Sequence, residues 1–192
     1  QYQQGSESTR AGLCDASAPD AAAPDAVAGK VEARVDSEPC WYWSSLLHYD
    51  YWQADKDRSM VWSARSNGTP AQGNAVILEP QNSNSILDCF KPEGGFGNNL
   101  VAWQLANSAL CLNVAGDSHS VGAWIILWPC TYSSNELFLP VANGLDDDST
   151  SYETYGSGGL CIDLDNGYNR GSILEQKECK WQDIYQSWYA QA

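Results

Sequence analysis

The sequence contains no apolar run that approaches the roughly 18 residues needed to cross a membrane as a helix. Basic residues are also scarce: 10 Lys and Arg stand against 24 Asp and Glu, giving a formal net charge of −14, and the basic residues form no stripe. Because such a field repels nucleic acid and anionic lipid, neither is expected as a partner. The chain does not begin with a basic region followed by an apolar stretch, so we expect Gln1 to be the first residue of an already processed chain.

The usual signatures of metal binding and catalysis are missing as well. There is no CxxC, and His48 and His119 lie far from any cluster of cysteines, so no zinc site is expected. The acidic stretches at Asp146 and Asp163 lack the ligand spacing of a calcium loop. No GxSxG motif occurs and nothing marks a hydrolytic carboxylate pair, so we expect neither an enzyme nor a bound cofactor.

Cysteine and the large aromatics are present in quantity. Seven cysteines in 192 residues indicate an oxidising compartment and hence a secreted protein. Nine tryptophans and ten tyrosines accompany only three phenylalanines. Because Trp and Tyr combine a flat apolar face with a polar edge, they suit both a β-rich core and the binding of flat, hydrated ligands.

The composition changes after the first 40 residues. Residues 1–40 are rich in Ala, Pro and Asp, contain one aromatic residue, and cannot bury enough apolar surface to offset the entropy of ordering. We interpret them as an irregular N-terminal arm or linker. Aromatics begin abruptly at the segment CWYW, so residues 41–192 are predicted to form the domain.

The domain has the pattern of an all-β protein built from repeats. Short apolar runs alternate with Gly, Asn, Ser and Asp clusters, which predicts many short strands with tight turns. Three segments, GNAVILEP, GAWIILWP and GSILEQKE, begin at Gly73, Gly122 and Gly171, which are 49 residues apart. Other matching positions are Leu110-Cys111 with Leu160-Cys161, Cys130 with Cys179, the triplet Trp52, Trp103 and Tyr152, and the terminal aromatics Phe90, Phe138 and Trp188. Such repeats cannot bury their apolar faces alone, so three copies must share one core.

The second and third repeats resemble the ricin-type (R-type) lectin domain, also classed among the family 13 carbohydrate-binding modules. The residues that carry the resemblance are LCLNVAGDSHSVGAWIILWPC with NELF, and LCIDLDNGYNRGSILEQKEC with QSW. The resemblance implies a β-trefoil of three repeats of about 49 residues, each ending in a QxW element. It also implies the disulfides Cys111–Cys130 and Cys161–Cys179.

In this family, each repeat can hold a shallow sugar pocket. An acidic residue two positions after the first cysteine accepts hydrogen bonds from sugar hydroxyls, and an aromatic two positions before the second cysteine stacks on the ring. A Gln or Ile lies two positions before that aromatic, and an Asn precedes the QxW element. Vicinal hydroxyls need a bidentate acceptor, and a pyranose C–H face needs a flat, polarisable wall.

The resemblance predicts a different set of sugar-binding residues in each repeat. The second has the sugar-binding candidates Asn113, Ile126, Trp128 and Asn135, with Asp117 on the same loop as a possible carboxylate. The third has the acceptor Asp163 and the QxW residue Gln186, but Lys177 replaces the aromatic, so Tyr168 or Trp181 would have to reach across. The first has Ala64 and Glu79 at the acceptor and aromatic positions, with Trp62 and Gln81 in place of the cysteines, and is expected to be inactive.

Three cysteines remain, an odd number. One alternative pairs Cys40 with Cys89 and leaves Cys14 for a neighbouring molecule; the other pairs Cys14 with Cys40 and leaves a buried free Cys89. Asn67 heads the sequon Asn-Gly-Thr and is a candidate N-glycosylation site.

Two functions are compatible with these observations. The first is a secreted lectin that binds a glycan through one or two shallow sites. The second is a structural subunit in which the trefoil is a building block, joined to copies of itself through the N-terminal arm and Cys14 into oligomers or filaments.

Overall fold

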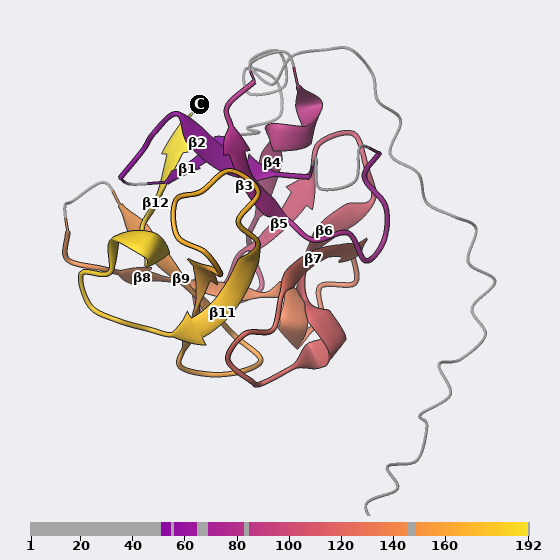
Figure 1. The fold of residues 1–192 in the computed structure, drawn as a ribbon. Coiled ribbons are helices and arrows are strands. Elements are labelled where there is room, and N and C mark those ends of the chain that lie inside the picture. Colours follow the sequence, from indigo (N-terminus) through magenta and orange to yellow (C-terminus); the bar gives the residue numbers. More distant parts are fainter. Residues whose placement is uncertain (1–50, 55, 65–68, 83–84, 146–148, 192) are drawn as a thin grey trace, which may run out of the picture.

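The structure is a computed structural model that describes residues 51–54, 56–64, 69–82, 85–145 and 149–191. The predicted arm, the boundary at residue 41, Cys14, Cys40 and the sequon at Asn67 lie outside these ranges. The described chain contains twelve β-strands in three sets of four, together with short 3-10 helices (Figure 1). The predicted all-β class is therefore confirmed.

Each set of four strands corresponds to one repeat. The first is β1 (Tyr51–Ala54), β2 (Met60–Ser63), β3 (Ile77–Pro80) and β4 (Phe90–Glu93). The second is β5 (Ala102–Leu105), β6 (Leu110–Val114), β7 (Ile125–Pro129) and β8 (Phe138–Ala142). The third is β9 (Thr150–Thr154), β10 (Leu160–Leu164), β11 (Leu174–Glu178) and β12 (Trp188–Gln191). The 3-10 helices are η2 (Ile86–Asp88), η3 (Ala115–Asp117), η4 (Ser134–Glu136) and η5 (Ile184–Gln186).

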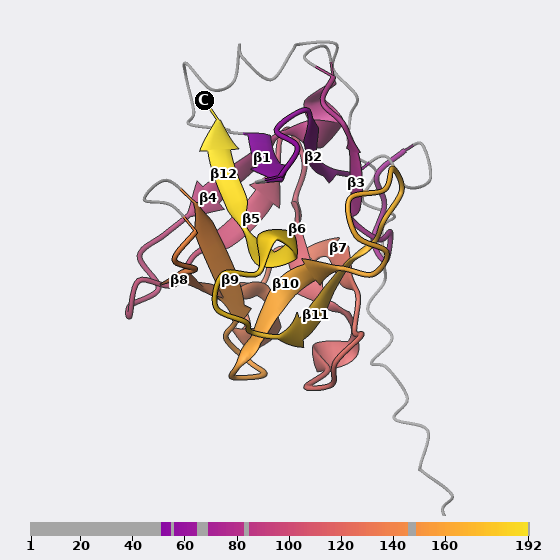
Figure 2. The ribbon, with the colours of Figure 1, turned by 60° about the vertical axis from the view of Figure 1, so that its left-hand side comes forward.

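The strand pairing repeats three times. In each repeat the second and third strands form an antiparallel hairpin: β2–β3, β6–β7 and β10–β11. The fourth strand of each repeat pairs with the first strand of the next, as β4–β5, β8–β9 and β12–β1. These six strands form a nearly closed barrel around one core (Figures 1 and 2). This threefold arrangement is a β-trefoil.

The glycines that are 49 residues apart connect the three hairpins. Gly73, Gly122 and Gly171 have φ values of 86°, 85° and 84°, a left-handed conformation that favours glycine. Each donates its backbone N–H to the hairpin of the next repeat, to Leu127, Gln176 and Leu78, at 2.7 to 2.8 Å. The repeats detected in the sequence therefore correspond to a threefold set of contacts. Each hairpin accepts a backbone hydrogen bond from the glycine of another repeat.

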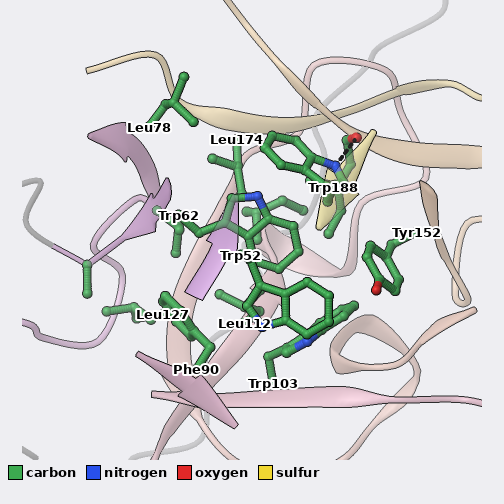
Figure 3. Close-up of a cluster of buried hydrophobic side chains, with 14 of the residues drawn as sticks. Trp52, Trp62, Leu78, Phe90, Trp103, Leu112, Leu127, Tyr152, Leu174 and Trp188 are labelled. Carbon is green, nitrogen blue, oxygen red and sulfur yellow. Dashed lines mark hydrogen bonds between the residues drawn. The ribbon is translucent and has the colours of Figure 1, made fainter. Parts of the chain in front are cut away.

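The core is organised around aromatic residues at equivalent positions. Trp52, Trp103 and Tyr152, which the sequence aligns with one another, form a triangle with ring centroids 4.6 to 5.3 Å apart and edge-to-face geometry (Figure 3). Trp62 lies against both tryptophans of this triangle and against Trp188. Edge-to-face pairs at these distances add about 0.5–1.5 kcal/mol each beyond the burial of their apolar area. The apolar faces of all three repeats pack together in this cluster.

The alignment of the first repeat has to be corrected by one residue. Trp128 lies opposite Cys111 in the second hairpin, and Glu79 lies opposite Val61 in the first. The position of the first cysteine is thus occupied by Val61, not by the predicted Trp62. By the same ladder, the acceptor position is Ser63 and not the predicted Ala64.

The cause is the length of the hairpin loop. Val61 and Glu79 are separated by one residue more than Cys111 and Trp128 are. An alignment based on Gly73 and Gly122, which precede the second hairpin strand, is therefore shifted by one residue on the first hairpin strand. The assignment of Glu79 itself, which lies after the loop, agrees with the ladder.

Candidate functional site

The outer face of the β6–β7 hairpin carries the predicted stacking aromatic. Side chains alternate between the two faces of a strand. On β7, Ile125 and Leu127 are fully buried, whereas Trp128 is 39% exposed. Asn113 lies opposite Ile126 in the ladder, so both belong to the same outer face as Trp128. The strand register therefore places an apolar wall beside an amide.

A disulfide fixes this wall to the acceptor strand. Cys111 and Cys130 are bonded, with their Cα atoms 5.0 Å apart, as expected. Cys111 lies directly opposite Trp128 and two residues before Asn113. By loop-closure reasoning such a bond contributes about 3 kcal/mol to stability. It also holds the two sides of the pocket at a fixed separation before any ligand arrives.

The loop that follows β6 brings a carboxylate to the same place. Gly116 and Asp117, both in η3, have φ values of 64° and 51°, so the backbone turns sharply there. A left-handed conformation is accessible to Gly and tolerated by Asp. The turn leaves the Asp117 carboxylate exposed at the edge of the pocket.

A chain of side-chain hydrogen bonds orients the polar groups. Asn113 Nδ2 donates to Glu136 Oε1 at 3.1 Å, and Asn135 Nδ2 donates to Asn113 Oδ1 at 3.3 Å. The buried Glu136 also accepts from the backbone N–H groups of Thr131 and Tyr132, at 2.7 and 2.6 Å. Glu136 thus fixes which way the Asn113 amide points, leaving its oxygen on the side of Asn135.

These segments enclose one open cavity of about 270 Å³. Its lining consists of Asn113, Gly116, Asp117, Ile126, Trp128 and Asn135. All five residues predicted for the second repeat are therefore brought together. Gly116 was not predicted, and the only sequence signal for it is the glycine that precedes an aspartate in a turn. The cavity combines an exposed indole, two amides and one carboxylate, which is a set of groups able to hold a small polyhydroxylated molecule.

The third repeat has the same framework with a different lining. Asp163 and Gln186 are both buried, and Gln186 Nε2 donates to Asp163 Oδ2 at 2.9 Å. Gln186 Oε1 accepts from the backbone N–H of Lys180 at 2.9 Å, as Glu136 does from Thr131. The adjoining open cavity measures about 510 Å³ and is lined by Asp163, Leu164, Asp165, Asn166, Gly167, Lys177, Lys180, Asp183 and Tyr185.

In this cavity, the ammonium group of Lys177 already contacts Asp163, the proposed acceptor of sugar hydroxyls. Its Nζ lies 2.6 Å from Leu164 O, 3.1 Å from Glu175 Oε1 and 3.5 Å from Asp163 Oδ1. Burial lowers the pKa of Lys177, but the hydrogen bond to Glu175 and the charges of Asp163 and Glu175 raise it by more, so the side chain stays positively charged. Asp163 Oδ1 also accepts from Leu164 N. The carboxylate oxygens of Asp163 are thus engaged by the protein itself.

The aromatic side chain that lines the third cavity is one that sequence reasoning missed. Tyr185 occupies the position of Asn135, one residue before the QxW element, and lines the cavity. Tyr168 does not line it; its ring packs on Tyr185 with centroids 4.9 Å apart. Trp181 lines a separate, smaller cavity and lies so close over Gly144 that a Cβ there would overlap the indole.

The first repeat has an ion pair where the stacking aromatic would be. Arg170 Nε lies 2.9 Å from Glu79 Oε2, and Glu79 is buried. Ser63, at the acceptor position, is also buried. Neither an exposed aromatic nor a carboxylate open to solvent stands at these two positions.

The remaining cysteines are in part assigned. Cys161 and Cys179 are bonded as expected, with Cα atoms 4.9 Å apart. Cys89 is buried and disulfide-bonded, which excludes the alternative in which it is a free thiol. Its partner lies outside the described residues.

Within the described ranges, no three His, Cys, Asp or Glu side chains are grouped so as to hold a metal ion. Over the same part of the chain, no helix is both long and apolar enough to traverse a membrane.

Comparisons with solved structures support the fold. The designed threefold-symmetric protein ThreeFoil superposes with a TM-score of 0.65 and 20% sequence identity, over 74% of this chain and 96% of that one. The Macrolepiota procera ricin B-like lectin, solved with lactose, gives a TM-score of 0.59 and 12% identity over 74% and 93% of the two chains.

The Polyporus squamosus lectin, bound to Neu5Acα2-6Galβ1-4GlcNAc, gives a TM-score of 0.61 and 14% identity. The match covers 74% of this chain and 48% of that lectin, so the chain spans about half the length of this relative. No family model matches the sequence, and the comparison with curated proteins found no match. At these identities the comparisons establish the β-trefoil fold that the structure shows.

Proposed function

We propose that this protein is a secreted, non-enzymatic carbohydrate-binding protein whose principal site is the cavity of the second repeat. The observation that carries the proposal is the convergence of Asn113, Asp117, Ile126, Trp128 and Asn135, from two strands and two 3-10 helices, around one cavity. Its partly exposed indole has no partner ring in the core cluster.

Each group has a role in this proposal. The exposed face of Trp128 stacks on the apolar C–H face of a pyranose. Asn113 and Asn135 bind hydroxyls as acceptors and donors, and the Asp117 carboxylate accepts two hydroxyl hydrogens at the rim. Ile126 closes the floor. The lactose and sialyl-glycan complexes of the trefoil lectins named above support a glycan as the ligand class.

The third cavity contributes weakly in this proposal. Asp163 remains a proposed second acceptor, but a sugar hydroxyl would have to displace Lys177 from it. A single shallow pocket binds weakly, since millimolar affinity corresponds to only about −4 kcal/mol. Useful binding then depends on several chains acting together on one surface. The two disulfides are consistent with the oxidising surroundings of a secreted protein.

The test is a glycan-array screen of the intact protein beside Trp128→Ala and Trp181→Ala. Trp181 is 69% exposed and lies outside the cavity, so it is the matched control for removing a surface indole. Binding by the parent and by Trp181→Ala that falls about tenfold or more in Trp128→Ala supports the proposal. Equal binding by all three proteins, or none by the parent, contradicts it.

A further inference from the structure

The second repeat exposes another indole on the same face as its pocket. Trp124 immediately precedes β7 and is 49% exposed, whereas Ile125 and Leu127 are fully buried. Residues 124, 126 and 128 therefore follow one another along the outer face, with Ile126 between the two tryptophans. The Trp124 carbonyl accepts from Ala115 N at 2.9 Å, which extends the pairing of β7 with the acceptor strand.

The acceptor lies between these two indoles. Asn113 is directly opposite Ile126, so Trp124 and Trp128 are its diagonal neighbours on either side. The Asp117 turn begins at Ala115, the residue paired with Trp124. The polar groups of the pocket are therefore flanked by aromatic faces in two directions along the strand.

The other side of Trp124 faces the third repeat. Trp124 forms an isolated bridge with Glu175, and Glu175 pairs with Lys177, which lines the cavity of that repeat. The outer face of β7 thus continues from Trp128 through Ile126 to Trp124, which a single bridge joins to Glu175.

Trp124 has no evident role in the core. The equivalent positions of the other repeats, defined by the same three bridges between hairpins, hold Ala75 and Ile173. A tryptophan is therefore not required to close the trefoil at this position. Single exposed apolar residues are common on protein surfaces, but this one continues a surface that already contains a cavity.

We propose that Trp124 is a second stacking platform, and that the ligand is an oligosaccharide that runs along the outer face of β7 rather than a single sugar. This inference rests on the proposed function. Four residues of a strand span about 13 Å, which is too far for one pyranose ring to touch both indoles. Two or three linked rings reach from Trp128, over Ile126, to Trp124.

The test compares short and longer ligands on matched variants. The probes are galactose- and glucose-terminated glycans of one to four sugars, titrated calorimetrically against the parent, Trp124→Ala, Trp124→Phe, Trp128→Ala and Trp181→Ala. We expect Trp124→Ala to weaken binding of the tri- and tetrasaccharides about five- to tenfold, the size of one aromatic contact, and to leave the monosaccharide within about twofold. Trp124→Phe keeps a flat apolar face and should retain most of the affinity.

The outcomes separate the two proposals. If Trp128→Ala abolishes binding while Trp124→Ala binds every glycan as the parent does, the proposed role of Trp124 is wrong and the proposed sugar pocket at Trp128 is supported. An equal loss for mono- and tetrasaccharides in Trp124→Ala also overturns the platform, because it indicates a disturbed pocket. If the parent binds none of the probes, both proposals fail. Circular dichroism of each variant shows whether it is folded.

Discussion

Asn113 Nδ2 donates to Glu136 Oε1 at 3.1 Å in the second repeat, and the third repeat holds the same pair with amide and carboxylate exchanged, as Gln186 Nε2 donates to Asp163 Oδ2 at 2.9 Å. Each of these two repeats thus buries one carboxyl group and one amide that donates to it. The exchange preserves the hydrogen bond but changes the position of the carboxyl group. It is on the 3-10 helix residue Glu136 in the second repeat and on the hairpin residue Asp163 in the third.

This relationship predicts that Asn113→Asp, although it restores the acidic acceptor of the R-type family, destabilises the protein. Two carboxylates would then meet in a buried site, and Glu136 would lose a donor. We expect the free energy of unfolding to fall by about 2–4 kcal/mol at neutral pH, measured by urea denaturation. The loss should shrink as the pH falls, because protonation of one carboxyl removes the repulsion.

The control is the double variant Asn113→Asp with Glu136→Gln, which copies the pair of the third repeat. Gln can accept from the backbone at residue 131 as Gln186 does at residue 180. The double variant should recover most of the stability. A single variant as stable as the double one would show that the pair is not coupled.

A second prediction concerns the third cavity. Replacing Glu175 by Ile and Lys177 by Trp copies the wall formed by Ile126 and Trp128, and frees Asp163 from the ammonium group. Calorimetry on a binding glycan should then show a rise from one ligand per chain to two. A stoichiometry that does not change, with the fold intact, would show that removing the lysine is insufficient to open this cavity.

A third prediction concerns alkaline pH. Burial raises the pKa of Tyr152 well above its ordinary value, and a hydrogen bond with Thr150 offsets this only in part. In the unfolded chain the hydroxyl ionises near pH 10, so this side chain costs no stability below that pH and lowers stability progressively above it. In Tyr152→Phe the free energy of unfolding should decline less steeply between about pH 10 and 12. A parallel decline in both proteins would refute this assignment.

A fourth prediction separates the roles of the two disulfides. Removing either one, as Cys111→Ala with Cys130→Ala or Cys161→Ala with Cys179→Ala, should cost about 3 kcal/mol of stability, because the closed loops are of similar length. Only the first pair flanks Trp128. Glycan affinity, measured below the unfolding transition, should therefore fall in the first variant and persist in the second. Equal affinities would indicate that the strand pairing alone fixes the pocket.

Much of the fold was predictable because its determinants are local and recur. The glycines at 73, 122 and 171 stand at positive φ and bond to the next hairpin, so their spacing is imposed by the threefold geometry. The buried triangle of Trp52, Trp103 and Tyr152 was likewise detectable as matching positions. The register of the first hairpin was not, because its loop has one more residue and no cysteine marks its strands.

The candidate site was predictable where one hairpin supplies most of it. Asn113, Ile126 and Trp128 were predicted from the resemblance to the R-type family, and the strand register places them on one face, whereas the wall of the third cavity was not predicted. Tyr185 comes from η5, after the hairpin, and a Tyr in place of the family's Asn gave no signal of a role. The position of Lys177 could be predicted, but its three contacts depend on the fold.

The division of the tryptophans into two environments has a spectroscopic consequence. Among the described tryptophans, Trp52, Trp62, Trp103 and Trp188 are buried among rings and aliphatic side chains, whereas Trp124, Trp128 and Trp181 are exposed to water. Solvent relaxation around an excited indole shifts its emission to longer wavelength, so the two groups emit in different parts of the fluorescence spectrum. A ligand lying along β7 would alter the long-wavelength component, while unfolding would alter the other. The intrinsic fluorescence can therefore report ligand binding and the folded state of the core separately.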